Sequence, residues 1–170
     1  KFRAQLATKP LRVYAKSPTQ LTLTVTDAKG KATRDFEIAH TKLMHLIVVS
    51  QDLSVFAHLH PVLNQDRFTV TYTFPRAGAF RLFADFTPQR QLAQVVSLTV
   101  NVAGVTPRPV ILTAESKRAK TVGPYLITLT TRPQRLQVGH EAMLTFAVAR
   151  TATRRPVEGL EEYLGARGHC

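Results

Sequence analysis

Short runs in which apolar and polar residues alternate recur along most of the chain, and none has the 3.6-residue period of an amphipathic helix. The clearest are LTLTVTD at Leu21–Asp27, FTVTYTF at Phe68–Phe74 and QVVSLTVNV at Gln94–Val102. Turn-forming residues separate them, as in Ala28–Lys31 and Pro75–Gly78, and Pro61–Asp66 is expected to form a loop. About seven such runs fall within roughly 95 residues, a density typical of sandwiches. We therefore predict an all-β protein with an immunoglobulin-like antiparallel β-sandwich.

The same pattern divides the chain into four parts. Residues 1–9 are polar and basic, which predicts a loosely held N-terminal arm, and the sandwich is expected over residues 10–104. A proline-containing run and a lysine-rich segment predict a linker over residues 105–124. Alternation resumes after it, so residues 125–170 are expected to hold further strands.

The last part of the chain resembles the first. Pro133–Val148 aligns with Pro10–Val25 without a gap, and Leu160–His169 aligns with Phe36–His45 after one inserted residue. This alignment predicts a partial second β-sandwich repeat, which ends at His169 where its own histidine strand would begin. An incomplete sandwich leaves strand edges unpaired, so self-association is a further expectation.

Four of the six histidines lie close together, with the spacing H-x4-H-x12-H-x-H. They are His40, His45, His58 and His60. Residues two apart in a strand share a face, so His58 and His60 should point the same way. A hairpin closed by residues 51–54 would place His45 opposite His60, with His58 on the diagonal. This prediction depends on register, because a slip of one residue moves His45 to the other face.

Imidazole groups gathered on one face of a hairpin are suited to bind a metal ion. Without a cysteine ligand, such a set suits Cu(II) or Zn(II) equally, and we predict a site for one of these ions formed by His45, His58 and His60. His40, just before the first strand, is the candidate fourth ligand. Met44 has the opposite strand parity and is expected in the core instead. The alternative is that the histidines only hydrogen-bond to backbone or to one another.

The histidine stretch also resembles a known family. The runs MHLIVVS at Met44–Ser50, DLS at Asp52–Ser54, F-x-HLHP at Phe56–Pro61 and LFADFTP at Leu82–Pro88 are similar to those of secreted bacterial heavy-metal-associated β-sandwich proteins, grouped with the YtkA-like domains. The run YLGA at 163–166, followed by Gly-His, is similar to the second repeat of that family. The resemblance implies an extracytoplasmic (periplasmic or secreted) location and a role in handling copper or other heavy metals. It therefore makes copper the expected metal, with zinc as the alternative.

Other polar residues near the stretch have less specific roles. Asp85 either orients a ligating histidine or caps a turn with Thr87, and the second interpretation is favoured. Asp52 is expected to form the hairpin turn through its side chain. His140 lies at a predicted turn, where it should be solvated. His169 is a candidate ligand only if its strand is completed.

The net charge of +12 is spread along the chain and favours an anionic surface as partner. Another extracytoplasmic protein is a second candidate partner, given the location that the resemblance implies. No nucleic-acid-binding motif accompanies it, so no specific nucleic acid is expected. The longest aliphatic run is Leu46–Val49, far short of the roughly 20 residues of a membrane span. No catalytic motif is present, so we do not expect an enzyme; a metal-dependent hydrolase is the weakest hypothesis. The main alternative to metal binding is a structural or adhesive immunoglobulin-like module.

Overall fold

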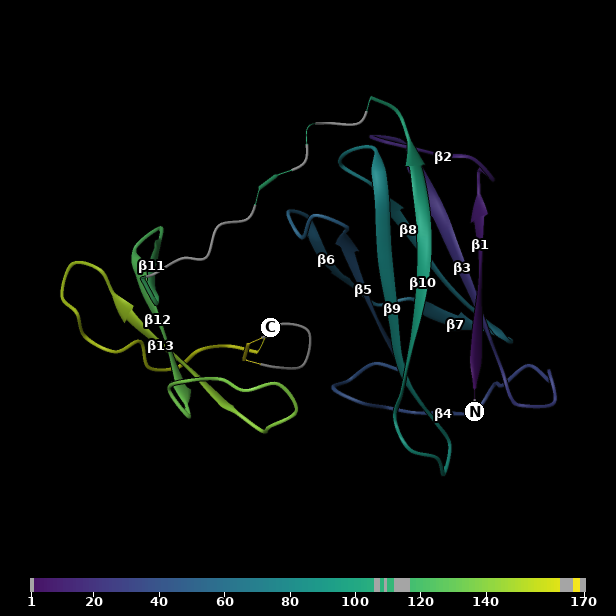
Figure 1. Cartoon of the computed structure of the whole chain (residues 1–170). Coiled ribbons are helices and arrows are strands. Elements are labelled where there is room, and N and C mark those ends of the chain that lie inside the picture. Colours follow the sequence, from purple (N-terminus) through teal and green to yellow (C-terminus); the bar gives the residue numbers. More distant parts are fainter. Residues whose placement is uncertain (1, 106–107, 109, 112–116, 163–166, 169–170) are drawn as a thin grey trace. The chain divides into compact units, whose positions relative to one another are not determined.

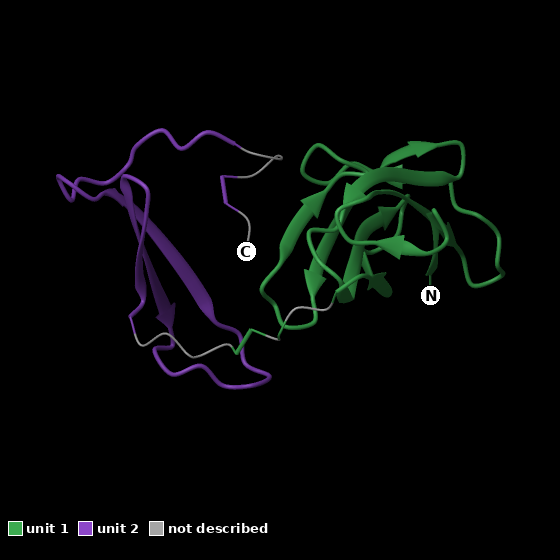
Figure 2. Cartoon of the chain, turned by 90° about the horizontal axis from the view of Figure 1, so that it is seen from above, with its two compact units in different colours: residues 1–112 green, residues 113–170 purple. Residues whose placement is uncertain are grey.

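The computed structural model describes residues 2–105, 108, 110–111, 117–162 and 167–168 (Figure 1). The chain divides into two compact units, Lys1–Leu112 and Thr113–Cys170, coloured separately in Figure 2. The predictions for His169 and for residues 163–166 lie outside the described residues. No helix in the described part of the chain has the length and hydropathy of a membrane span.

Unit 1 is built from ten described strands. They are β1 (Arg3–Lys9), β2 (Val13–Tyr14), β3 (Pro18–Thr26), β4 (Phe36–Glu37), β5 (Met44–Ser50), β6 (Phe56–Leu59), β7 (Val62–Asn64), β8 (Arg67–Thr73), β9 (Gly78–Pro88) and β10 (Gln94–Ala103). One sheet has the order β1-β3-β8-β7, and the other has the order β2-β10-β9-β5-β6, with β4 paired to β9. β2 runs parallel to β10, and the other pairs are antiparallel. This strand order corresponds to the A-B-E-D and C-F-G sheets of immunoglobulin domains, so the predicted all-β sandwich is confirmed.

The core of unit 1 lies between the two sheets and explains the alternation in the sequence. Alternate residues of β3, namely Leu21, Leu23 and Val25, are 0% exposed. Met44 and Leu46 on β5 are equally buried, so Met44 is a core residue as predicted. Side chains two apart in a strand share a face, and the residues between these therefore point away from the core. His45 is one of them.

Three segments differ from the sequence prediction. Residues 3–9, predicted as an arm, form the edge strand β1, whose successive residues alternate between exposed and half-buried. Residues 62–64, predicted as loop, form β7. Residues 119–122, predicted as linker, form β11. All three are edge strands, which bury little apolar surface, so their sequences show only weak alternation.

Unit 2 is a three-stranded antiparallel sheet in the order β11 (Ala119–Val122), β12 (Tyr125–Arg132) and β13 (Met143–Arg150). The pairing of β12 with β13 repeats that of β1 with β3 at a constant offset of 123 residues. Arg3 pairs with Thr26 in unit 1, and Leu126 pairs with Ala149 in unit 2. Burial differs between the two units. Leu23 is 0% exposed, whereas Phe146, at the equivalent place on β13, is 50% exposed. The face of β13 that corresponds to the core face of β3 is therefore open in unit 2.

Candidate metal centre

The β5–β6 hairpin has the register that the histidine spacing predicts. Leu46 pairs with Leu59 and Ile47 pairs with His58. The register continues toward the turn, where the backbone N–H of Ser50 donates to the carbonyl of Val55 at 3.0 Å. One residue farther from the turn than the Leu46–Leu59 pair, the same register places His45 opposite His60.

The turn that fixes this register is organised by the carboxylate of Asp52. Its Oδ1 accepts hydrogen bonds from Ser50 Oγ at 2.8 Å and from Ser54 Oγ at 2.9 Å. The same oxygen pairs with the guanidinium of Arg76, and Oδ2 accepts from the backbone N–H of Val110 at 3.2 Å. The hydrogen bond from Arg76 and, to a smaller extent, that from Ser50 hold the pKa of the Asp52 carboxyl far below its usual range. The prediction that Asp52 forms the turn is confirmed, but the sequence did not indicate its pairing with Arg76.

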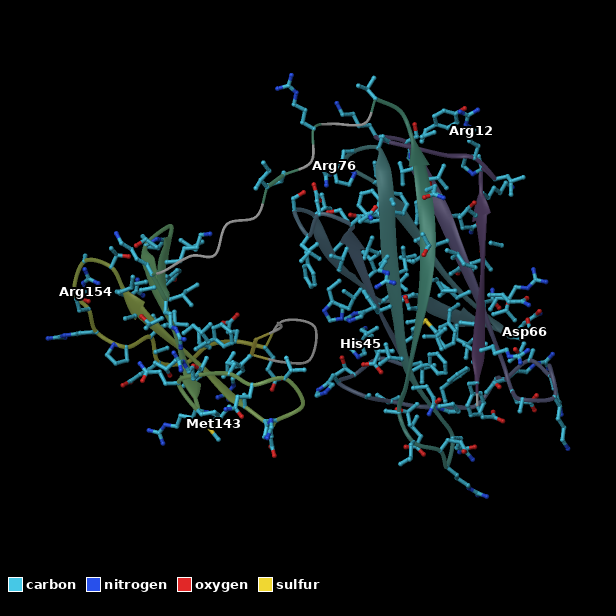
Figure 3. The ribbon with its side chains drawn as sticks, viewed as in Figure 1. Arg12, His45, Asp66, Arg76, Met143 and Arg154 are labelled. Atoms are coloured by element: carbon cyan, nitrogen blue, oxygen red, sulfur yellow. The ribbon has the colours of Figure 1, made fainter. Side chains whose placement is uncertain are left out.

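The histidines lie on the outward face of the sheet, away from the core. On this face His45 pairs across β5 and β9 with Asp85, and Ile47 pairs with both Phe83 and His58. Figure 3 shows His45 beside β5 and β9. The strand alternation that sends Met44 into the core thus sends His45 outward, where residues from β6 can reach it.

Three ring nitrogens converge at this place. His45 Nδ1 lies 2.9 Å from His58 Nε2 and 3.1 Å from His60 Nε2. His45, His58 and His60 can each offer one ligand atom within 4.8 Å of the others. With metal–nitrogen bonds of about 2.0–2.1 Å, two nitrogens on one ion at right or tetrahedral angles are about 2.8–3.4 Å apart. The distances from His45 fall in this range, so the group could hold a metal ion.

The orientation of the His45 ring is fixed by the backbone. His45 Nε2 lies 2.9 Å from the carbonyl oxygen of Ala39. A carbonyl oxygen only accepts hydrogen bonds, so Nε2 carries the ring proton and Nδ1 presents its lone pair to His58 and His60. Histidine ligands in metalloproteins commonly donate their second N–H to such an acceptor, which fixes the tautomer. No sequence pattern indicated the part played by Ala39.

A tight turn holds the Ala39 carbonyl in place. Ala39 and Lys42 exchange backbone hydrogen bonds of 2.9 and 3.0 Å. The two residues between them, His40 and Thr41, have positive φ angles of 46° and 69°. Two successive left-handed residues are typical of a type I′ turn. The turn therefore lies beside His45 with its carbonyl directed at the ring.

The rings of the cluster shield one another from solvent. The centroid of His45 lies 5.1 Å from that of His58 and 4.8 Å from that of His60. His45 is only 8% exposed, although it lies on the outward face. The His40 ring is farther away, with its centroid 6.1 Å from that of His45, and its side chain is exposed. The structure thus brings three of the four predicted ligands together and leaves His40 at the margin.

The remaining candidates lie outside this cluster. Asp85 and Thr87 are both inside β9, so the interpretation of Asp85 as a turn cap was wrong. The Asp85 side chain is exposed and makes no hydrogen bond with a described residue. His140 belongs to unit 2, where its Nδ1 lies 3.3 Å from the carbonyl of Val138 and its side chain is exposed.

Residues 3–104 match the model of a family described as a domain of unknown function, DUF8832. The chain belongs to this family. No curated protein and no solved structure matches it. The matched residues span β1 through β10, so the DUF8832 domain is the sandwich of unit 1 and contains the three clustered histidines.

Proposed function

We propose that the DUF8832 domain binds one copper ion through His45 Nδ1, His58 Nε2 and His60 Nε2, and that it sequesters or delivers heavy metal outside the cytoplasm. Zinc is the alternative metal. The observation that carries the proposal is the convergence of the three ring nitrogens, with 2.9 and 3.1 Å separating His45 Nδ1 from the other two. The proposal assigns no catalytic step to the site.

Hydrogen bonding alone is a poor explanation for this convergence. His45 Nδ1 has one lone pair, because its Nε2 donates to Ala39, and one lone pair accepts one good hydrogen bond. Two ring nitrogens nevertheless approach it, one from His58 and one from His60. A metal ion placed between the three nitrogens would use all three lone pairs, once His58 and His60 carry their protons on Nδ1.

The ligand chemistry favours copper or zinc over harder cations. The group consists of imidazoles only, and neutral imidazole suits Cu(II) and Zn(II), whereas Mg²⁺ and Ca²⁺ prefer oxygen ligands. We propose His40 as the fourth ligand, since its exposed ring lies 6.1 Å from that of His45, centroid to centroid, and belongs to the turn that positions His45. The resemblance of the histidine stretch to secreted heavy-metal-associated proteins supports both copper and an extracytoplasmic location.

The second candidate is a structural or adhesive immunoglobulin-like module without metal. It is favoured by one observation: His45 is already hydrogen-bonded to the Ala39 carbonyl, so the ring stabilises the turn whether or not an ion binds. In this case the basic surface would meet an anionic partner, and added metal would leave the melting temperature unchanged.

Calorimetric titration of the whole chain with Cu(II) and with Zn(II) tests the proposal. We expect one equivalent to bind and to raise the melting temperature, and a chelator to reverse the shift. The double variant His58→Ala/His60→Ala should lose this binding. His140→Ala is the matched control, because it removes an exposed imidazole from unit 2 and should leave the titration unchanged. Equal binding by wild type and the double variant would overturn the proposal.

A further inference from the structure

A hollow on the outward face of the same sheet lies at the end of β5 that leads into the β5–β6 turn. Its volume is about 520 Å³. Val49, Arg81 and Thr99 form one row across β5, β9 and β10, and Phe83 follows on the same face of β9. These residues line the hollow together with Leu53 of the turn. The hollow has the size of a small-molecule site, which is typically about 300–1,000 Å³.

The walls of the hollow are mainly apolar and are held in a fixed arrangement. Val49 and Phe83 belong to paired strands, so their backbones are constrained by the sheet. Leu53 is 65% exposed and has a positive φ of 57°. Its backbone N–H donates to the carbonyl of Ser50 at 2.9 Å within the turn that Asp52 organises. The exposed side chain of Leu53 is therefore held at a rigid turn beside other apolar residues, where it can contact the apolar part of a bound molecule.

Arg81 is the one charged residue among the lining residues. It forms no ion pair with any part of the chain that the structure describes, where the two ion pairs join Arg67 to Asp66 and Arg76 to Asp52. The nearest acidic residue on its own strand face is Asp85, four residues and thus about 13 Å along the strand. The guanidinium is therefore available to a ligand, and its planar donors match a carboxylate in a bidentate arrangement.

We propose that this hollow binds a small carboxylate with an apolar body. The carboxylate would pair with Arg81, and the apolar body would pack on Phe83, Val49 and Leu53. Two sources share this chemistry: a free aromatic or aliphatic acid, and the C-terminal residue of another polypeptide. The site is separate from the histidine cluster, because β5 places Val49 four residues from His45, so its test is independent of metal binding.

The test is an NMR titration of the whole metal-free chain with 3-phenylpropionate and with its neutral amide, 3-phenylpropionamide. The two probes have nearly the same shape, so their difference reports the carboxylate. We expect the acid to bind at least about tenfold more tightly, because charge-assisted bidentate bonds are stronger than neutral ones. The backbone amides of Val49, Phe83 and Thr99 should shift. Equal affinity for acid and amide, or no shift up to about 10 mM probe, would overturn the proposal.

Variants of Arg81 separate a specific site from general attraction to a basic protein. Arg81 is exposed and outside the core, so Arg81→Gln should fold normally and lose the preference for the acid. Arg81→Lys should keep part of it, since a lysine pairs with a carboxylate at one point only. Arg67→Gln on β8, in the other sheet, is the matched control and should behave as wild type. An equal loss in Arg67→Gln would show nonspecific attraction and contradict the proposal.

A second pair of probes distinguishes the two sources of carboxylate. A tripeptide ending in phenylalanine is compared with its C-terminally amidated form. Tighter binding of the free tripeptide than of 3-phenylpropionate favours the end of a polypeptide, and the reverse order favours a free acid. Binding of both tripeptide forms with equal affinity would contradict the pairing of the carboxylate with Arg81.

Discussion

His45 Nε2 donates to the carbonyl oxygen of Ala39 at 2.9 Å, which leaves His45 Nδ1 as the nitrogen that faces His58 and His60. The hydrogen bond to Ala39 fixes the tautomer of His45. Together with the distances to His58 and His60, it defines which ring nitrogen each of the three histidines offers to a metal ion. One ligand should bind through Nδ1 and two through Nε2.

The tautomers give the first prediction. In the metal-free protein, long-range ¹H–¹⁵N spectra should show His45 with its proton on Nε2. Added Zn(II), which is diamagnetic, should shift Nδ1 of His45 and Nε2 of His58 and His60, while His45 keeps its tautomer. A metal-induced shift at Nε2 of His45 would contradict this donor set.

Single alanine substitutions should show how much each histidine contributes to copper affinity. Replacing His45, His58 or His60 with alanine should lower copper affinity by more than about 100-fold, because even partners outside the coordination sphere commonly contribute 10- to 100-fold. His40→Ala should lower it by about tenfold or more if His40 supplies the fourth ligand. A change of less than about twofold in His40→Ala, measured by competition with a chelator of known affinity, would remove His40 from the site while keeping the other three.

The turn next to His45 should influence metal affinity without contributing a metal ligand. Lys42→Pro removes the N–H that donates to the Ala39 carbonyl and should lower affinity by about 10- to 100-fold, the usual effect of losing an orienting partner. Thr41→Gly is the control, because its φ of 69° is a conformation that glycine adopts readily. Similar affinities for the two variants would show that the turn does not orient His45.

Metal affinity should also depend on pH. Protons compete with the ion for imidazole nitrogens, whose pKa in model peptides is about 6.5. Affinity should therefore fall as the pH decreases, by up to about tenfold per pH unit for each imidazole that must lose a proton to bind the ion. Titrations between about pH 5 and 8 measure the slope. An affinity that does not change over this range would exclude imidazole ligands.

A different pH dependence is expected for the stability of the hairpin turn. Arg76 and Ser50 lower the pKa of Asp52 in the folded state, so the charged carboxylate stabilises the fold. This contribution is fully present above the unfolded pKa of about 3.9 and is lost as pH falls from there toward the lower folded value. Asp52→Asn should therefore destabilise unit 1 at pH 7 in urea unfolding, and the difference from wild type should shrink near pH 3. A constant difference would contradict this origin.

The sequence predicted the site better than it predicted its surroundings. Strand alternation and a short turn determine the hairpin register, so the placement of His45, His58 and His60 on one face followed from local spacing. Pairing between β5 and β9 joins residues far apart in the chain, so the position of Asp85 opposite His45 had no local signal. The sequence also did not predict the positive φ angles of His40 and Thr41, because neither residue is the glycine or asparagine that usually indicates such a turn.

The edge strands β1, β7 and β11 were missed for a related reason. An edge strand pairs on one side only and buries few apolar side chains, so polar and basic residues are tolerated in it. Residues 3–9 contain Leu6 as their only large apolar residue. Their assignment depends on the pairing with β3, which composition does not reveal.

The pairing of β12 with β13 repeats that of β1 with β3 at a constant offset. Unit 2 can therefore serve as a reference for how much a second, packed sheet contributes to the free energy of unfolding. Leu23 and Phe146 occupy equivalent places, one covered and one open. Leu23→Ala should lower the free energy of unfolding by about 2–5 kcal/mol, and Phe146→Ala by less than half as much. Urea unfolding followed at the amides of β3 and of β13 separately would measure both. A single polypeptide thus allows sheet formation and sheet-on-sheet packing to be measured as two separate quantities.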